Sequence, residues 1–380
     1  MIYKVFKDME LSQLGFGAMR LPVIDGDDGK IDVETTFRMV DYAMEQGINY
    51  YDTAWGYHGE HSEEVMGEAL RKYPRDSYYF ATKFPGYDLG NMPKVKEIFE
   101  KQLEKTGLEY FDFYMLHNVC EMNVNQYLDP QYGIVEYLLE QKKAGRIKHL
   151  GFSCHGEMPV LEQFLPVYGN EMEFCQLQLN YMDWDFQHGK DKVELLKEYD
   201  IPVWVMEPLR GGRLAKVTEA QEKTLKKLRP EETIPAWAFR FLQSLPEVKV
   251  ILSGMSDEAQ LRANVETFRE NKPLNEEEMG ALMAIAKEMS DERLVPCTAC
   301  HYCTDHCPIG LDIPRLIELY NEHTLTVRGG LFGFIAPMAM AAIPPEKQPS
   351  ACLDCGSCEK VCPQQIQISD VMEDFVKQLS

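Results

Sequence analysis

Short runs of strand-favouring residues alternate with amphipathic helical segments, and this alternation limits the possible folds more than any other feature of the chain. Eight runs are rich in β-branched and aromatic residues, which favour strands. They are LSQLGFGAMRL, INYYDTA, SYYFATKF, FDFYMLHNV, IKHLGFSCH, EFCQLQLNY, IPVWVMEPL and VKVILSGM. Strands that alternate with helices form βαβ units, which predict a parallel sheet.

The segments between the runs carry apolar residues at three- and four-residue steps, as in VETTFRMVDYAMEQG and KVKEIFEKQLEKTGL. Eight strand–helix units in about 250 residues fit a closed (β/α)8 TIM barrel. An open doubly wound sheet is the alternative, but its G-x-G-x-x-G turn is missing, because Arg20 stands where the third glycine would fall. We therefore predict an α/β barrel, with IYKVFK and MELS forming a hairpin at its floor.

The eleven cysteines are unevenly distributed, since eight of them lie between Cys297 and Cys362. A disulfide framework would suit a secreted protein, but MIYKVFKDMEL has no apolar signal run. Dense thiols in a reducing compartment indicate metal binding instead, and we expect a cytoplasmic protein. The chain length suits one large and one small domain, which we place at residues 1–290 and 291–380.

Two cysteine runs, CTACHYCTDHCPIG and CLDCGSCEKVCPQQ, share the pattern C-x2-C-x2-C-x3-C-P. In two-cluster ferredoxins the fourth, proline-tagged cysteine of each run ligates the other cluster. By that rule one [4Fe–4S] cluster is held by Cys297, Cys300, Cys303 and Cys362, and the second by Cys307, Cys352, Cys355 and Cys358. Zinc is the alternative, but a structural zinc site usually shows two separated C-x-x-C pairs. The segment from Arg293 to about Ser380 thus resembles a bacterial-type two-cluster ferredoxin.

The formal charge of −22 excludes some classes of partner. Basic residues are dispersed, so nucleic acid and anionic membranes are not expected partners. The longest apolar stretch, residues 331–343, is too short to span a bilayer and contains Pro337. The acidic excess from Asp291 onward is consistent with a ferredoxin or flavodoxin as redox partner, and equally with ordinary solubility.

Four polar side chains follow successive predicted strands, at the barrel end where reactive groups usually lie. Asp52 and Tyr57 occur in YDTAWGYH, Lys83 in ATKF and His117 in YMLHN. A carbonyl that accepts hydride develops negative charge on its oxygen and needs a proton donor. A tyrosine with an ordinary pKa of about 10 is a poor acid, but a neighbouring ammonium stabilises its phenolate. Each residue alone has a structural explanation, such as a cap or a packed ring; their succession indicates a catalytic set.

These motifs resemble the aldo-keto reductases. D-T-A-x-x-Y, T-K and L-H follow the second, third and fourth strands, and the resemblance covers roughly residues 3–290. It implies nicotinamide-dependent reduction of a small-molecule carbonyl, or oxidation of an alcohol. It also implies that Tyr57 is the general acid, Lys83 the modulator of its pKa, Asp52 the partner of Lys83, and His117 the residue that orients the carbonyl.

The same resemblance implies a set of cofactor contacts on the later strands and loops. They are Ser153, Gln176, Gln178, Asn180, Met206, Pro208, Leu209, Gly211, Gln260 and Asn264. Ser256 stands where a Lys or Arg often grips the 2′-phosphate of NADPH, although Arg262 or Arg213 could compensate. The cofactor expected is therefore NADP(H) or NAD(H).

The two halves of the chain raise a chemical conflict, because nicotinamide passes two electrons as hydride whereas each cluster passes one. Three interpretations follow. The clusters are structural or sense redox state in a reductase; or they feed electrons to a barrel that holds FMN or a one-electron-reducible substrate; or the barrel is silent and the chain is an electron-transfer or regulatory module. The four strand-end residues favour an active oxidoreductase.

Overall fold

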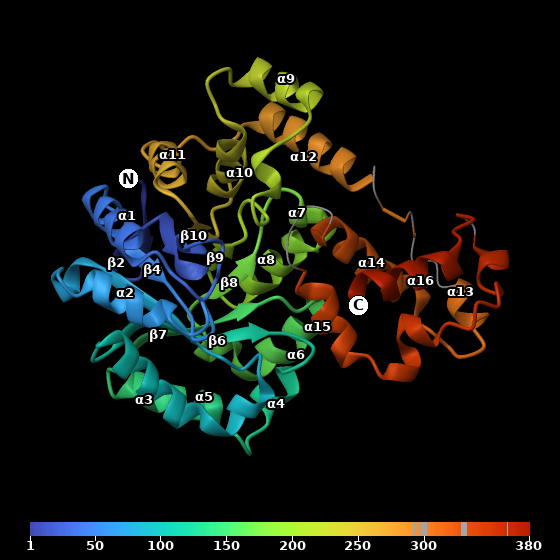
Figure 1. Cartoon of the computed structure of the whole chain (residues 1–380), viewed down its shortest axis with the longest axis horizontal. Coiled ribbons are helices and arrows are strands. Elements are labelled where there is room, and N and C mark those ends of the chain that lie inside the picture. The colour runs from blue at the N-terminus through green and yellow to red at the C-terminus, as the bar shows by residue number, and fades with distance from the viewer. Residues whose placement is uncertain (292–293, 296, 298–301, 328–332, 363) are drawn as a thin grey trace. The chain divides into compact units, whose positions relative to one another are not determined.

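Eight parallel strands close into a barrel in the first part of the chain (Figure 1). The computed structural model describes residues 1–380 except 292–293, 296, 298–301, 328–332 and 363. The barrel order is β10-β3-β4-β5-β6-β7-β8-β9. Its strands are β3 (Leu14–Gly17), β4 (Tyr50–Asp52), β5 (Tyr79–Phe84), β6 (Phe111–Val119), β7 (Ile147–Cys154), β8 (Cys175–Gln178), β9 (Val203–Met206) and β10 (Val248–Gly254). The predicted (β/α)8 fold is confirmed.

Helices connect these strands, as the amphipathic segments predict. They are α1 (Val33–Glu45), α2 (Ser62–Leu70), α3 (Val95–Thr106), α4 (Val124–Leu128), α5 (Ile134–Lys143), α6 (Met158–Tyr168), α7 (Asp183–Phe186), α8 (Gly189–Glu198), α9 (Glu219–Leu228), α10 (Ile234–Gln243), α11 (Glu258–Thr267) and α12 (Glu276–Asp291). Several begin at a side chain that accepts a backbone N–H, as Asp257 does from Gln260 at α11. These caps explain why the helices begin where they do.

A hairpin of β1 (Tyr3–Phe6) and β2 (Met9–Ser12) precedes the barrel, as predicted. Phe6 packs edge-on against the buried Trp204, with ring centroids 5.0 Å apart. The run LSQLGFGAMRL is not one strand, however, because the chain changes partners at Gln13. Its N–H donates to Ile2 and its carbonyl accepts from Ile251, so residues before it pair in the hairpin and residues after it pair in the barrel.

Alternate residues along the strands fill the barrel interior. The buried cluster consists of Phe6, Leu11, Tyr50, Ala81, Phe113, Met115, Phe174, Trp204, Val250 and Leu252. Asp52, Lys83 and His117 each follow a member of this cluster by two positions. Because strand side chains alternate between faces, these three polar groups point into the same interior, beyond its apolar core.

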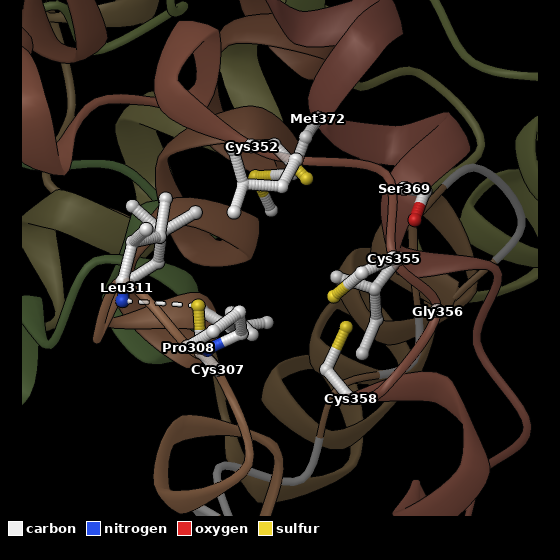
Figure 2. Close-up of a pocket in the computed structure, with 13 residues that line it drawn as sticks. Cys307, Pro308, Leu311, Cys352, Cys355, Gly356, Cys358, Ser369 and Met372 are labelled. Carbon is white, nitrogen blue, oxygen red and sulfur yellow. Dashed lines mark hydrogen bonds between the residues drawn. The ribbon is translucent and has the colours of Figure 1, made fainter.

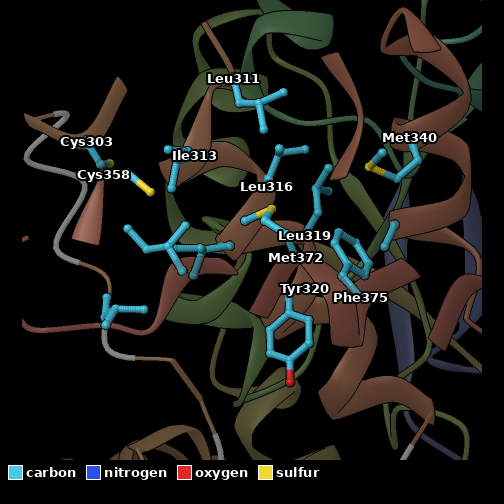
Figure 3. Close-up of a cluster of buried hydrophobic side chains, with 14 of the residues drawn as sticks. Cys303, Leu311, Ile313, Leu316, Leu319, Tyr320, Met340, Cys358, Met372 and Phe375 are labelled. Atoms are coloured by element: carbon cyan, nitrogen blue, oxygen red, sulfur yellow. The ribbon is translucent and has the colours of Figure 1, made fainter. Parts of the chain in front are cut away.

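Residues Cys120–Met122 and Ala284–Ser380 form a second compact unit, and α12 contributes to both units. Its helices are α13 (Tyr302–Asp305), α14 (Ile313–Val327), α15 (Ile335–Ala342) and α16 (Ile368–Leu379). Their apolar faces meet in a core that includes Leu316, Leu319, Met340, Met372 and Phe375 (Figure 3). Within the described ranges no helix has the length and apolar character needed to cross a membrane. The domain division at residues 290 and 291 stays a prediction.

Candidate active site and cysteine pocket

Lys83 and Asp52 form a buried ion pair at the ends of β5 and β4. Lys83 Nζ donates to Asp52 Oδ1 at 2.6 Å and to the carbonyl oxygen of Thr53 at 2.8 Å. The Lys83 side chain has no exposed surface, and that of Asp52 is 4% exposed. Burial is the largest single influence on Lys83 and lowers its pKa, but the contacts with the Asp52 carboxylate and Tyr57 together raise the pKa of Lys83 above its ordinary value. The pair therefore places a fixed ammonium inside the barrel.

Tyr57 lies beside this ammonium, in the turn between β4 and α2. Lys83 Nζ donates to Tyr57 Oη at 3.3 Å. Burial raises the pKa of Tyr57, and the Lys83 ammonium lowers it only in part. The lower pKa of Tyr57 that the sequence predicts is therefore wrong, because burial has the larger effect. The phenol is consequently protonated at neutral pH, next to a cation that would stabilise its conjugate base.

His117 faces Tyr57 from the end of β6. Its ring lies edge-on to those of Tyr57 and Tyr87, with centroids 6.0 and 5.2 Å away. Burial, together with the charges of Lys83 and His155, lowers the pKa of His117 well below its ordinary value. Its Nδ1 is buried and has no hydrogen-bond partner among the residues that the structure describes. A neutral imidazole thus lies beside the ring of Tyr57.

Three predicted cofactor contacts lie on adjacent strand ends of the barrel. Ser153 of β7 accepts a hydrogen bond at Oγ from the Asn118 N–H at 2.8 Å. Gln176 of β8 is buried, and its Nε2 lies 3.8 Å from Met206 Sδ. Its Oε1 has no hydrogen-bond partner within the described part of the chain. The register pairs Ser153 with Gln176 across β7 and β8. The structure therefore brings Ser153, Gln176 and Met206 together.

Gln178 and Asn180 instead form hydrogen bonds with the buried carboxylate of Asp183, which the sequence analysis did not single out. Both donate side-chain amide hydrogen bonds to Asp183, at 2.9 and 2.7 Å. Arg210 adds an Nε–H bond to the same carboxylate at 3.1 Å, and its φ of 47° is left-handed. Pro208, Leu209 and Gly211 flank Arg210 in the loop after β9. Asp183 and Arg210 carry no local motif, because their pairing joins two separate loops.

Gln260 and Asn264 occupy the first turns of α11. Asn264 Nδ2 donates to Ser253 Oγ at the end of β10 at 3.0 Å, and Gln260 Oε1 accepts from the Ser256 N–H at 3.0 Å. Arg262 on the same helix packs its guanidinium over Tyr42, 4.2 Å from the ring centroid. The two amides thus lie at the end of the barrel that carries Tyr57, Lys83 and His117.

In the second unit, one pocket is lined by four of the predicted cluster ligands. Cys307 comes from the first cysteine run, and Cys352, Cys355 and Cys358 come from the second. Figure 2 shows their side chains around a common space, together with Leu311 and Met372. Leu311 donates its N–H to Cys307 Sγ at 3.3 Å. Among the side chains that the structure describes, no three His, Cys, Asp or Glu residues converge as ligands of a single metal ion would.

The other predicted ligand set is described only in part. Cys303 is buried in the same apolar core as Cys358, and Cys297 and Cys362 pack against it. Cys300 lies outside the described residues. The structure therefore brings three of these four cysteines to one core.

Known proteins resemble this chain over most of the barrel. The uncharacterized oxidoreductase YqkF from Bacillus subtilis is 24% identical, over 74% of this chain and 94% of its own length. NADH-specific methylglyoxal reductase from Escherichia coli is 26% identical, over 70% and 92%. Among solved structures, the holo form of aldo-keto reductase AKR11C1 from Bacillus halodurans superimposes with a TM-score of 0.61 at 24% identity, covering 75% of this chain and 96% of that one.

Two family matches account for most of the chain. Residues 13–287 match the aldo/keto reductase family, and residues 296–366 match the 4Fe-4S dicluster domain. The first match agrees with the closed barrel, and the second with the cysteine-lined pocket. The chain therefore belongs to the aldo/keto reductase family of oxidoreductases and carries a C-terminal 4Fe-4S dicluster domain.

Proposed function

We propose that the chain reduces a small-molecule carbonyl, or oxidises the corresponding alcohol, with a nicotinamide cofactor. The observation that carries this proposal is the chain of contacts from Asp52 through Lys83, both buried, to the half-buried Tyr57, at 2.6 and 3.3 Å. An ammonium fixed beside a protonated phenol is an arrangement that lets tyrosine act as an acid near neutral pH.

The protein's own groups account for the proton that carbonyl reduction requires. When bound, the nicotinamide supplies hydride to the carbonyl carbon. Tyr57 gives its proton to the oxygen, and Lys83 stabilises the resulting phenolate. Neutral His117 orients the carbonyl and cannot compete as an acid. The product is an alcohol, and Tyr57 regains its proton from solvent.

The strand ends offer a site that suits the nicotinamide carboxamide. The unpartnered Oε1 of buried Gln176 can accept from its amide nitrogen, and Ser153 lies on the adjacent strand. Asn180, Gln178 and the loop Pro208–Leu209–Gly211 would border the rest of the cofactor. Gln260 and Asn264 would hold the adenine end. These contacts are made to parts that NADH and NADPH share, so they do not discriminate between the two cofactors.

We propose further that residues 291–380 form a domain with two [4Fe–4S] clusters and that the protein works in the cytoplasm. The pocket of Cys307, Cys352, Cys355 and Cys358 supports one cluster, because the interlocked spacing rule predicts that set. Each thiolate of a cubane ligates a different iron, so the four sulfurs need not meet at one point. Cys297, Cys300, Cys303 and Cys362 would hold the second cluster.

The test uses anaerobically purified full-length protein with NADH or NADPH and two aldehydes, methylglyoxal and 4-nitrobenzaldehyde. We expect Tyr57→Phe to lower kcat by about 10²- to 10⁴-fold. Tyr3→Phe, at the opposite end of the barrel, is the matched control and should keep full activity. Full activity in Tyr57→Phe would refute the assigned acid. Release of FMN on denaturation, without nicotinamide binding, would support the flavin-linked alternative and overturn the proposal.

A further inference from the structure

A second buried carboxylate, Glu63, lies outside the set described above. It is the second residue of α2 and has no exposed surface. Its oxygens accept from Thr82 Oγ1 at 2.6 Å, Gln102 Nε2 at 2.6 Å and Lys105 Nζ at 2.9 Å. A buried charge is costly unless it is paired and hydrogen-bonded. Glu63 therefore fixes three side chains around it.

One of these side chains, Gln102 of α3, reaches the backbone of the proposed active site. Its Nε2 donates to the carbonyl oxygen of Lys83 at 3.0 Å. On the same edge of β5, the Ala81 carbonyl accepts from the Thr53 N–H, but β4 ends at Asp52. Carbonyls two residues apart point to the same side of a strand. Gln102 thus takes the place of a strand partner on the β4 side of Lys83, where the register with β4 ends at Asp52 and Ala81.

The orientation of the Gln102 amide is fixed from its other end. Tyr114 Oη donates to Gln102 Oε1 at 2.6 Å, so Oε1 is the acceptor and Nε2 the donor. Helices α2 and α3 can approach closely because Gly67 has no side chain. A Cβ at this position would overlap the backbone of Thr106. This approach brings Glu63 and Gln102 within hydrogen-bonding distance.

Helix α2 also acts on the acceptor of the Lys83 ammonium. Ser62, next to Glu63, shares a hydrogen bond of 2.8 Å between its Oγ and Thr53 Oγ1. The Thr53 carbonyl is one of the acceptors of Lys83 Nζ. Glu63 therefore connects through Gln102 to the backbone of Lys83, and Ser62 connects through Thr53 to its ammonium.

We propose that Gln102, oriented by Glu63 and Tyr114, is a positioning residue that holds Lys83 against Tyr57. The inference rests on the proposed function, because it assigns Gln102 a role through the proposed acid. The distance of 3.3 Å between Lys83 Nζ and Tyr57 Oη is already long for a hydrogen bond, so a small displacement of Lys83 would break it. Displacing a catalytic group by about 1 Å can cost on the order of 10²-fold in rate.

Gln102→Met keeps the side-chain volume and the charge but removes both donors. We expect kcat to fall by about tenfold with KM unchanged, because substrate contacts are untouched. The ascending limb of kcat for alcohol oxidation should move to higher pH, because Tyr57 must ionise with less help from Lys83. Tyr114→Phe removes only the bond that orients the amide and should show the same shift in smaller degree.

Two controls separate positioning from general destabilisation. Gln243→Met removes a buried glutamine from α10, where Oε1 accepts from Arg240 at 2.9 Å, and should lower thermal stability without moving the pH limb. A second readout needs no substrate: ultraviolet phenolate absorbance, taken as the difference between each holoprotein and its Tyr57→Phe counterpart. Tyr57 should ionise at higher pH in Gln102→Met.

The outcomes are distinct. An unchanged Tyr57 titration and pH limb in Gln102→Met would overturn the positioning role, as would an equal shift in Gln243→Met. If Tyr57→Phe retains full activity, the proposed function fails, and the phenolate titration still decides whether Gln102 controls the contact between Lys83 and Tyr57.

Discussion

Cys307, the last cysteine of the first run, lines the same pocket as Cys352, the first cysteine of the second run (Figure 2). This relationship makes the two runs interdependent. We expect Cys307→Ser and Cys352→Ser each to lower iron from about eight to about four atoms per chain, because both residues belong to the same predicted ligand set. The double variant should lose no more iron than either single variant.

Cys303→Ser is the matched comparison, because Cys303 belongs to the other predicted set. Combined with Cys307→Ser it should remove nearly all iron. If the Cys303 and Cys307 substitutions instead prove non-additive, each run ligates its own cluster and the interlocked assignment is wrong. Iron analysis and visible absorbance of anaerobic protein measure both results.

Removing the charge of Lys83 should destabilise the barrel as well as inactivate it. Lys83→Met leaves the buried Asp52 carboxylate without its ammonium partner, a change that typically costs about 3–5 kcal/mol. Adding Asp52→Asn removes the uncompensated charge and should restore most of the stability but no activity. Tryptophan fluorescence measures unfolding of the barrel, where all four tryptophans lie. A fully stable single variant would contradict this account of the pair.

Acid should destabilise the barrel through three histidines that are held neutral in the folded state. Burial, before other causes, lowers the pKa of His149 and of His155 to about 4, and that of His117 well below its ordinary value of about 6.5. Between pH 6.5 and about 4 the unfolded chain therefore binds protons that the folded chain does not, so stability falls as pH falls. Each histidine contributes up to about 1.4 kcal/mol per pH unit.

Urea unfolding at several pH values in this window measures the slope. His149→Gln, at the barrel floor, should reduce it by about one such contribution while leaving the proposed active site intact. A slope that His149→Gln leaves unchanged would show that this histidine is not held neutral.

We predict that the lack of a side chain at Gly86 keeps His117 in position, through the contact of both residues with Tyr127. Tyr127 Oη donates to the His117 carbonyl oxygen at 3.0 Å, and a Cβ at Gly86 would overlap that hydroxyl. Gly86→Ala should cost about 1–3 kcal/mol of stability and lower kcat/KM for carbonyl reduction. Gly280→Ala, in open space on α12, is the control and should lose neither. Wild-type kinetics in Gly86→Ala would refute the coupling.

We predict that the residues around Ser256, at the adenine end of the proposed cofactor site, make NADH the better ligand. Ser256 is exposed and uncharged, and Arg38 and Arg262 both donate to Glu258. Ser256→Arg supplies a cation for a 2′-phosphate and should tighten NADPH binding by about tenfold, which corresponds to about 1.4 kcal/mol. Its affinity for NADH should change little. Fluorescence titration measures both constants, and equal effects on the two cofactors would contradict the assignment.

The barrel and the strand-end residues were predictable because both depend on local patterns. A long β-rich run such as that of β6 is recognisable without its neighbours, and strand ends in a parallel barrel share one edge. The break at Gln13 was not predictable, because it depends on Ile2 and Ile251, which are remote in the sequence.

The direction of the Tyr57 pKa shift and the pairing of residues from different loops could not be predicted from the sequence either. The pKa of Tyr57 depends on the balance between its burial and its contact with Lys83, and neither quantity is local. Asp183 and Arg210 meet only when the loops after β8 and β9 are folded. The cysteine pocket, in contrast, followed from spacing, because three ligands of each predicted cluster lie on one short loop.

The hairpin of β1 and β2 has a kinetic consequence. With Phe6 packed on Trp204 and an aromatic core below Lys83, the barrel interior is closed at one end. Every reactant of the proposed reaction must then arrive and depart through the same entrance. A reactant that binds deeper, against Gln176, must enter before the second reactant. It can leave only after the second reactant has left. In the proposed reaction, the barrel would thereby impose an order of binding and release, in which the first molecule to bind is the last to leave.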